Sequence, residues 1–455
     1  MTSLIRPDRE GNTQRQAVSP ARLAAFEILR RVEGGAYASV LLASQEDDLK
    51  PADRALCYEL VMGVLRRQLW LDRLIENYAS RSITSLDLAV RIALRVGLYQ
   101  LRFLTRVPAS AAVNESVNLV RRARLRSAMS FVNAVLRRAS REPEYDPATK
   151  ISDPVERVAV ETSHPAWLIE RWNKAFGAAE TERFATANNQ PAPIAFRVVP
   201  NRAREAIVLD QLQLAGAILQ PSQISNGAWR VFGGGSLLRE LSRAGQIYMQ
   251  DEASQLVAQL LDAKQGERVL DLCSAPGSKA TQIAARGSGG VSVIAADLHE
   301  HRLKTVVESA RLQGVGGILC VVLDGLESLP FPTGSFDRVL VDAPCSGTGT
   351  LRHNPEIRWR ISPEDIRDLS TRQKQMLSNA SQLVKPGGRL VYSSCSVEPE
   401  ENEEVVSAFL ESSDGFVQKS LPVKAPLATT LGAARTWPHR DGVDGFFIAA
   451  FERDK

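Results

Sequence analysis

At 455 residues the chain is too long for a single ordinary hydrophobic core, and its length suggests two to four domains. Hydrophobic residues make up 44% and charged residues 24%, a balance that excludes a disordered chain. No run of eighteen apolar residues occurs, and residues 1–18 lack the apolar core of a signal peptide. We therefore expect a short disordered leader at 1–18 and a cytosolic protein that does not enter a membrane.

The cysteines are odd in number and widely spaced in a chain without an export signal. This usage argues against a disulfide framework and leaves free thiols for chemistry. No C-x-x-C pair occurs, and the histidines show no metal-ligand spacing with the cysteines, so we expect no metal site. The five cysteines are Cys57, Cys273, Cys320, Cys345 and Cys395.

The net charge of +4 hides an asymmetry along the chain. Residues 1–150 carry 24 Lys and Arg against 16 Asp and Glu, whereas the remainder is acidic overall. Between Arg54 and Arg141 all sixteen basic residues are arginines. Such residues can form a solvated helix surface, but arginines in this density also suit a phosphate-binding face. The first third of the chain is thus predicted to meet nucleic acid.

Residues 19–145 predict an all-α bundle. Apolar residues recur there at helical spacing, and the breaks fall at glycines and prolines. A linker rich in proline follows, and residues 155–247 alternate between helical and strand-like pieces, as in a small α+β accessory module. The predicted helical segments of the bundle are 22–32, 55–67, 69–79, 86–103, 112–122 and 127–138.

From residue 248 to 455 short apolar runs alternate with helical segments. Strands separated by helices imply a mostly parallel, doubly wound α/β sheet of the Rossmann-like kind, whose functional loops lie at the carboxyl ends of the strands. The predicted strands are 268–272, 291–296, 318–322, 338–341, 388–393 and 445–451.

The first of these strands runs into a tight glycine- and proline-containing turn and then a helix. The backbone N–H groups of such a turn suit a carboxylate or a phosphate. The second and third strands end in Asp297 and Asp324, placed to meet a ribose and an adenine, although either could instead cap a helix. Since the turn is not G-x-G-x-x-G, these features favour a nucleoside cofactor without a pyrophosphate, namely S-adenosylmethionine.

The fourth and fifth strands run into Asp342-Ala-Pro-Cys345 and Ser-Ser-Cys395. Two cysteines that follow neighbouring strands would converge on one cleft, whereas coincidental cysteines would be buried core thiols. Methylation of cytosine at C5 needs such a thiol, since addition to C6 makes C5 nucleophilic. Asp342 is the candidate acid near ring N3, and the second thiol could serve the later elimination.

Four motifs resemble the RNA cytosine-5 methyltransferases of the Sun/Fmu (RsmB) group, and the resemblance covers almost the whole chain. The motifs are DLCSAPGSKA, VDAPCSGTG, YSSCSVEPEENE and WPHRDGVDGFF. Residues 19–145 resemble the NusB-like helical RNA-binding domain that this branch carries at its front. The resemblance implies a C-terminal class I methyltransferase domain and small-subunit (16S) ribosomal RNA as substrate, at the cytosine of RNA position 967, before full subunit assembly. No obligatory protein partner is evident.

Carried onto matching positions, the resemblance implies a role for each motif residue. Cys395 becomes the nucleophile and Cys345 the thiol that releases the product, while Asp297 holds the cofactor ribose. Asp324 and Asp342 also line the cofactor pocket. A loop wraps the methionine part of the cofactor; its residues are Cys273, Ser274, Ala275, Pro276, Gly277, Ser278 and Lys279.

The chain departs from the family pattern at two positions of this loop. Ser278 stands where a second glycine is usual, and Ser274 where alanine is common. Both residues are small, so we expect the loop conformation to survive, with an effect on cofactor affinity.

Three alternatives stay open at this point. In DNA cytosine-5 methyltransferases the cysteine after proline attacks, and by that logic Cys345 would be the nucleophile. An amino-methylating enzyme would need an N/D-P-P-Y/F motif in place of Asp342-Ala-Pro-Cys345. A non-catalytic RNA adaptor with a vestigial methyltransferase fold is a third possibility.

Arg358 and its neighbours after the Cys345 loop could line an RNA channel or simply pack.

Overall fold

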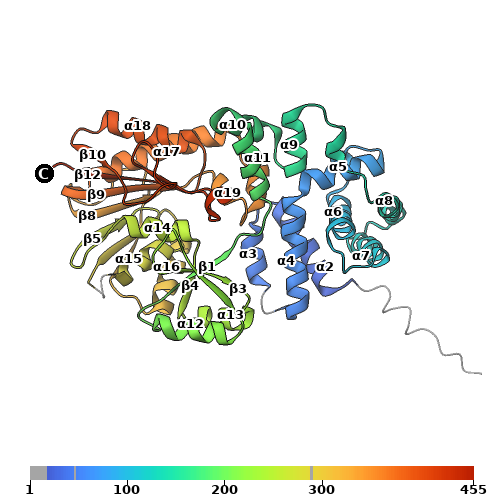
Figure 1. The fold of residues 1–455 in the computed structure, drawn as a ribbon, viewed down its shortest axis with the longest axis horizontal. Coiled ribbons are helices and arrows are strands. Elements are labelled where there is room, and N and C mark those ends of the chain that lie inside the picture. Colours follow the sequence, from blue (N-terminus) through green and yellow to red (C-terminus); the bar gives the residue numbers. More distant parts are fainter. Residues whose placement is uncertain (1–17, 46–47, 287–289) are drawn as a thin grey trace, which may run out of the picture. The chain divides into compact units, whose positions relative to one another are not determined.

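The computed structural model describes residues 18–45, 48–286 and 290–455 (Figure 1). Positions 1–17 of the predicted leader lie outside the described residues. The chain divides into two compact units, the first formed by 1–189 and 353–360, the second by 190–352 and 361–455. The predicted boundaries near 145–155 and 247–248 divide the sequence differently and stay a prediction.

The first unit is helical, which confirms the predicted all-α bundle at the front of the chain. No predicted segment covered the short helix α3. None of the helices among the described residues is long and apolar enough to span a membrane. The helices of this unit are α2 (Pro20–Glu33), α3 (Ala38–Ser44), α4 (Pro51–Arg66), α5 (Gln68–Ala79), α6 (Leu88–Phe103), α7 (Ala109–Arg122), α8 (Met129–Arg141), α9 (Pro154–Thr162), α10 (Ala166–Phe176) and α11 (Ala178–Ala187).

Helix α6 is the central element of the bundle core. Asp87 caps its start by accepting a hydrogen bond from the backbone N–H of Ala89 at 2.8 Å. Its valines, its isoleucine and two of its leucines, Leu94 and Leu98, are buried, and the helix packs against α2, α4, α5, α7 and α8. Arg95 of α6 is buried too, and its guanidinium donates to both carboxylate oxygens of Asp72, at 2.7 and 2.8 Å. The arginine-rich composition of this region therefore includes residues that stabilise the bundle itself.

Segment 353–360 belongs with the first unit although it follows the Cys345 loop in the chain. The side chain of Arg358 is fully buried, and its Nη1 donates to the carbonyls of Thr162 and Ser163, at 3.4 and 3.1 Å, and to Oδ1 of Asn189 at 2.9 Å. Burial lowers the pKa of this guanidinium to about 9. Because Thr162 ends α9, the cation also meets the negative end of a helix dipole. Arg358 is thus a packing residue rather than a channel residue.

Replacing Arg358 with alanine is expected to destabilise the first unit by about 3 kcal/mol, since three buried oxygen acceptors lose their donor. Circular dichroism at 222 nm during heating measures the change as a lowered unfolding temperature. Arg367→Ala, in which an exposed arginine is removed, is the control and should leave the transition in place. An Arg358→Ala protein that unfolds at the wild-type temperature would contradict this prediction.

The small sheet of the second unit is antiparallel, with strand order β2-β3-β1-β4. Helices α12 and α13 pack on it, and their leucines share a buried core with Phe196 of β1 and Val231 of β3. This module confirms the predicted α+β character of the middle region. Its elements are β1 (Ile194–Val198), α12 (Glu205–Leu214), β2 (Ile218–Pro221), β3 (Ala228–Phe232), α13 (Gly235–Arg243) and β4 (Ile247–Met249).

The large sheet of the second unit has the strand order β10-β12-β9-β8-β5-β6-β7, with β11 paired to β12. The strands β9, β8, β5, β6 and β7 are parallel. Strand β12 pairs antiparallel with β9, and β10 pairs antiparallel with β12, so the predicted mostly parallel α/β domain is confirmed. Its strands are β5 (Arg268–Asp271), β6 (Ser292–Asp297), β7 (Ile318–Val322), β8 (Phe336–Asp342), β9 (Val384–Ser394), β10 (Phe416–Lys419), β11 (Ala434–Arg435) and β12 (Phe447–Arg453).

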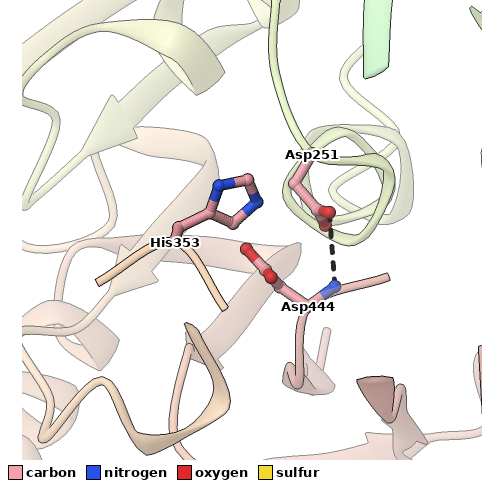
Figure 2. A group of neighbouring side chains, drawn as sticks. All are labelled: Asp251, His353 and Asp444. Atoms are coloured by element: carbon pink, nitrogen blue, oxygen red, sulfur yellow. Dashed lines mark hydrogen bonds between the residues drawn. The ribbon is translucent and has the colours of Figure 1, made fainter. Parts of the chain in front are cut away.

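Helices cover both faces of this sheet, as alternate strand residues require. Val269 of β5 packs with α14, α15 and α16, whereas its neighbour Leu270 packs with α17 and α18. Asp251 caps α14 and also accepts a hydrogen bond from the backbone N–H of Asp444 at 3.2 Å, which ties that helix to the segment before β12 (Figure 2). The helices are α14 (Glu252–Leu260), α15 (Ser278–Arg286), α16 (Glu300–Gln313), α17 (Pro363–Ser381), α18 (Glu403–Ser412) and α19 (Pro438–Asp441).

Candidate active site

The strand order places four functional loops side by side at one edge of the large sheet. Because β9, β8, β5 and β6 are adjacent and parallel, their carboxyl ends meet there. Backbone hydrogen bonds join neighbouring loops. The N–H of Ser274 donates to the carbonyl of Ala296 at 2.8 Å, and the N–H of Ala343 donates to the carbonyl of Ser393 at 2.9 Å. The predicted site residues therefore come from adjoining segments of one edge.

The loop 273–279 turns sharply from β5 into α15. Gly277 has a φ of +100°, and a Cβ there would lie 3.0 Å from the backbone of Val306 on α16, so only glycine fits without a shift. The following residue, Ser278, opens α15, and the free N–H groups of a helix start face the loop. Burial raises the pKa of the Cys273 thiol in this loop, which keeps Cys273 protonated. The predicted strand, tight turn and helix start are thus present, and binding of a ligand by this turn stays a prediction.

Lys279 and Asp342 form an ion pair inside this edge. Their Nζ and Oδ2 atoms are 2.5 Å apart, and the Ser393 hydroxyl donates to Oδ1 of Asp342 at 2.6 Å. Burial lowers the pKa of the Lys279 ammonium, but the Asp342 carboxylate outweighs burial and the pKa ends up raised. Lys279 therefore stays charged and holds a proton within reach of Asp342.

Asp271, at the end of β5, lies at this edge of the sheet and is not among the predicted site residues. It is 1% exposed, and neither of its carboxylate oxygens has a hydrogen-bond partner among the described residues. Burial raises the pKa of this carboxyl to about 7, and the charge of Asp342 adds to the shift. Its position at a strand end was the available signal, the same one that identified Asp297. A buried acid without a donor suits a ligand that brings one, such as an ammonium group.

The two predicted nucleoside-binding aspartates differ in their surroundings. Asp297 ends β6 and is 3% exposed; it accepts the backbone N–H of His299 at 3.1 Å, and Arg302 lies 3.2 Å away. Asp324 is partly exposed and accepts the N–H of Leu326 at 2.9 Å. His299, rather than Asp297, is the N-cap of α16. Among the described residues, no helix starts in the turn directly after Asp324, so neither aspartate is a helix cap.

The two cysteines of the candidate site lie in direct contact. Cys345 Sγ and Cys395 Sγ are 2.9 Å apart, and the backbone N–H of Cys395 donates to Cys345 Sγ at 3.2 Å. Both thiols are partly exposed. The hydrogen bond with Cys395, followed by burial, raises the pKa of the Cys345 thiol. The sheet thus brings together Cys345, Cys395 and Asp342, as their positions after β8 and β9 predict.

Residues of this edge fit S-adenosylmethionine. Asp271 offers unpaired acceptor oxygens for an ammonium, and the loop at Gly277 offers backbone N–H groups and close approach. Asp297, at the end of the next strand, offers a carboxylate for ribose hydroxyls.

Comparison with known proteins agrees with this geometry. Residues 258–452 match the family described as 16S rRNA methyltransferase RsmB/F, residues 19–141 match the NusB family, and residues 164–233 match a ferredoxin-like domain of the RsmF/B-like methyltransferases. The fold and the site define an S-adenosylmethionine-dependent rRNA methyltransferase.

Whole-chain relatives carry the same organisation. A probable ribosomal RNA small subunit methyltransferase B of Bacillus subtilis is 35% identical, covering 94% of this chain and 98% of its own. Ribosomal RNA small subunit methyltransferase B of Pseudomonas putida is 36% identical, with 94% and 97% covered. The crystal structure of PH0851 superposes with a TM-score of 0.83 at 28% identity, covering 96% of this chain and 99% of its own. The chain belongs to the 16S rRNA methyltransferase RsmB/F family.

Proposed function

We propose that the protein transfers a methyl group from S-adenosylmethionine to C5 of a cytosine in 16S rRNA, at the site of RNA position 967, through a covalent bond between Cys395 and ring C6. The observation that carries the proposal is the contact of two thiols, 2.9 Å apart, beside the Lys279–Asp342 ion pair. A single thiol would suffice for attack. Two thiols in contact suit a reaction that must add to a ring and later eliminate.

The first step places the thiols in different roles. The family resemblance assigns attack to Cys395 and release to Cys345, and the raised pKa of the Cys345 thiol fits a group that keeps its proton during attack. Cys395 gives its S–H proton to solvent and forms the S–C6 bond, and the ring electron pair moves toward N3. Lys279, through Asp342, supplies the proton or hydrogen bond that stabilises N3. The cofactor supplies an electrophilic methyl group, which ring C5 takes.

The second step restores the aromatic ring. Cys345 first gives its S–H proton to solvent, and the resulting thiolate removes the proton from C5. The C5–C6 double bond forms again, the S–C6 bond breaks with its electron pair returning to Cys395, and N3 gives its proton back to Asp342. Once Cys395 is bound to the ring, the hydrogen bond that most raises the pKa of Cys345 is gone. The base thus becomes available only after the nucleophile has been used.

For the cofactor we propose the arrangement that the family resemblance implies. The loop from Cys273 to Lys279 surrounds the methionine part, Asp297 binds the ribose, and Asp324 and Asp342 line the pocket. The buried Asp271 adds an acceptor for the methionine ammonium, since its oxygens have no other donor among the described residues.

This arrangement predicts a pH dependence of cofactor affinity. The carboxyl of Asp271 has a pKa of about 7, so it is neutral below that pH and must lose a proton to face an ammonium. The affinity for S-adenosylmethionine should therefore rise between about pH 5 and 7, by at most about tenfold per pH unit. Titration calorimetry across this range measures it. Asp271→Asn should bind weakly at pH 7 and show no such slope, whereas a flat wild-type profile would contradict the prediction.

For the RNA we propose that the arginine-rich helical unit supplies the phosphate-binding face. Eight arginines of the stretch between Arg54 and Arg141 are exposed, whereas Arg66 and Arg95 are buried and serve the bundle. We further propose action in the cytoplasm on RNA before full subunit assembly, without an obligatory protein partner. The exposed set is Arg81, Arg106, Arg122, Arg124, Arg126, Arg137, Arg138 and Arg141.

The proposal is tested by incubating the protein with labelled S-adenosylmethionine and unmodified 16S rRNA, then digesting the RNA to nucleosides. We expect the label in 5-methylcytidine, at one position of the RNA. Label in an N-methylated nucleoside would overturn the C5 assignment. Transfer to no RNA, together with no binding of S-adenosylmethionine, would favour the non-catalytic adaptor.

A further inference from the structure

A buried carboxylate lies directly behind the two thiols, outside the residues assigned above. Glu401 ends a short 3-10 helix, Pro399–Glu401, between β9 and α18, and its side chain is fully buried. Its Oε1 accepts the backbone N–H of Ser346 and the amide of Gln373, both at 2.9 Å. Its Oε2 accepts the hydroxyls of Ser346 and Ser396, both at 2.5 Å. Four donors compensate the buried charge.

These bonds surround the Cys345 position. Ser346 follows Cys345 in the chain, and Gln373 also donates its amide to the carbonyl of Pro344, which precedes Cys345, at 2.8 Å. Three of the four bonds to Glu401 therefore hold this loop on both sides of its thiol.

The neighbouring Asn402 does the same for the other cysteine. Its Oδ1 accepts the hydroxyl of Ser394 at 2.5 Å, and its Nδ2 donates to the carbonyl of Ser396 at 2.9 Å. Ser394 and Ser396 flank Cys395. Since Asn402 is fully buried and adjacent to Glu401, the two side chains together fix both thiol loops from behind.

We propose that Glu401 and Asn402 are positioning residues that hold the two thiols in register, Glu401 chiefly for the release thiol Cys345 and Asn402 for the attacking thiol Cys395. The proposal rests on the proposed function, because it divides the pair between attack and release. A misplacement of about 1 Å at a reacting group lowers the rate by about 10²-fold, so we expect loss of either positioning residue to lower turnover by about that factor.

Glutamine at position 401 tests the first half. The Glu401→Gln amide has the same size, but its nitrogen cannot accept a hydrogen bond, so the two bonds that one carboxylate oxygen accepts are lost or, at the serine hydroxyls, reversed. With S-adenosylmethionine and 16S rRNA, we expect turnover to fall about 10²-fold while the covalent protein–RNA adduct accumulates on denaturing gels. Asn402→Ala should lose turnover without accumulating adduct, because attack itself is slowed. Glu404→Gln, the same exchange at an exposed position of α18, is the control.

A measurement without RNA keeps the two claims separate. The charge of Glu401 contributes to the raised pKa of Cys345, so removing it should shift alkylation of that thiol to lower pH. Iodoacetamide labelling across pH, in Cys395→Ala with and without Glu401→Gln, reads this shift. If Cys345→Ala traps no adduct and wild type methylates no RNA, the proposed function fails, and the labelling profile alone tests the role of Glu401. Unchanged turnover, adduct level and labelling profile in Glu401→Gln would overturn the proposal.

Discussion

Replacing Cys395 with alanine is expected to abolish methyl transfer to 16S rRNA and to remove the covalent protein–RNA adduct. Without a sulfur to add to C6, ring C5 stays too electron-poor to take a methyl group. We expect a loss of at least about 10⁴-fold in turnover, the order found when a covalent nucleophile is removed. Cofactor affinity, measured by calorimetry, should stay near the wild-type value because Cys395 contributes to the ring chemistry only.

The partner thiol should behave in the opposite way. Cys345→Ala leaves attack and methyl transfer intact but removes the base for the C5 proton, so the methylated adduct should accumulate in a denaturing gel. Cys320→Ala, which removes a partly exposed cysteine on β7, is the matched control and should turn over normally. Adduct trapped by Cys395→Ala and lost in Cys345→Ala would reverse the assignment of the two thiols.

The second large effect is expected at the ion pair. Lys279→Met keeps most of the side-chain volume but removes the proton source 2.5 Å from Asp342. Asp342 would then lack the ammonium that supplies the proton for ring N3, where negative charge develops. We expect the single-turnover rate of methyl transfer to fall about 10²- to 10⁴-fold, the range for loss of a general acid.

The control for this variant is Lys304→Met, in which an exposed lysine of α16 is replaced. Single-turnover measurement with saturating cofactor separates the chemical step from weakened binding. A Lys279→Met protein that transfers methyl at the wild-type rate would show that the pair has no part in the ring chemistry.

Most elements of the fold could be predicted from local sequence patterns, namely apolar periodicity and the residues that bound each run. Strand β7 agrees residue for residue with the predicted segment 318–322, because its apolar run is bounded by glycines and an aspartate. The ends of β9 were harder to predict, since the strand begins at Val384 and runs through the Pro-Gly-Gly sequence that predicts a turn. The registers with β8 and β12 leave residues 385–388 unpaired, and Gly387 has a φ of +74°, so the predicted turn is present as an irregularity within the strand.

Site residues that directly follow a strand could be predicted from the sequence. Residues whose position depends on contacts with distant parts of the chain could not. The contact of Cys345 and Cys395 follows from two neighbouring strands. Glu401, in contrast, lies in the acidic run Glu398-Pro-Glu-Glu-Asn-Glu, which looks solvent-exposed in the sequence. Its burial depends on serines and a glutamine that are 5 to 55 residues away. Arg358 belongs to the same class, since its acceptors lie more than 160 residues earlier.

The most direct test of the account is to locate the covalent bond itself. RNA that carries 5-fluorocytidine at the target position retains the adduct, because the C5 substituent cannot leave as a proton. The two cysteines fall on separate tryptic peptides, 339–352 for Cys345 and 390–419 for Cys395. After digestion of protein and RNA, mass spectrometry should find the methylated nucleotide on peptide 390–419. A nucleotide attached to peptide 339–352 would contradict the assignment of Cys395 as the nucleophile.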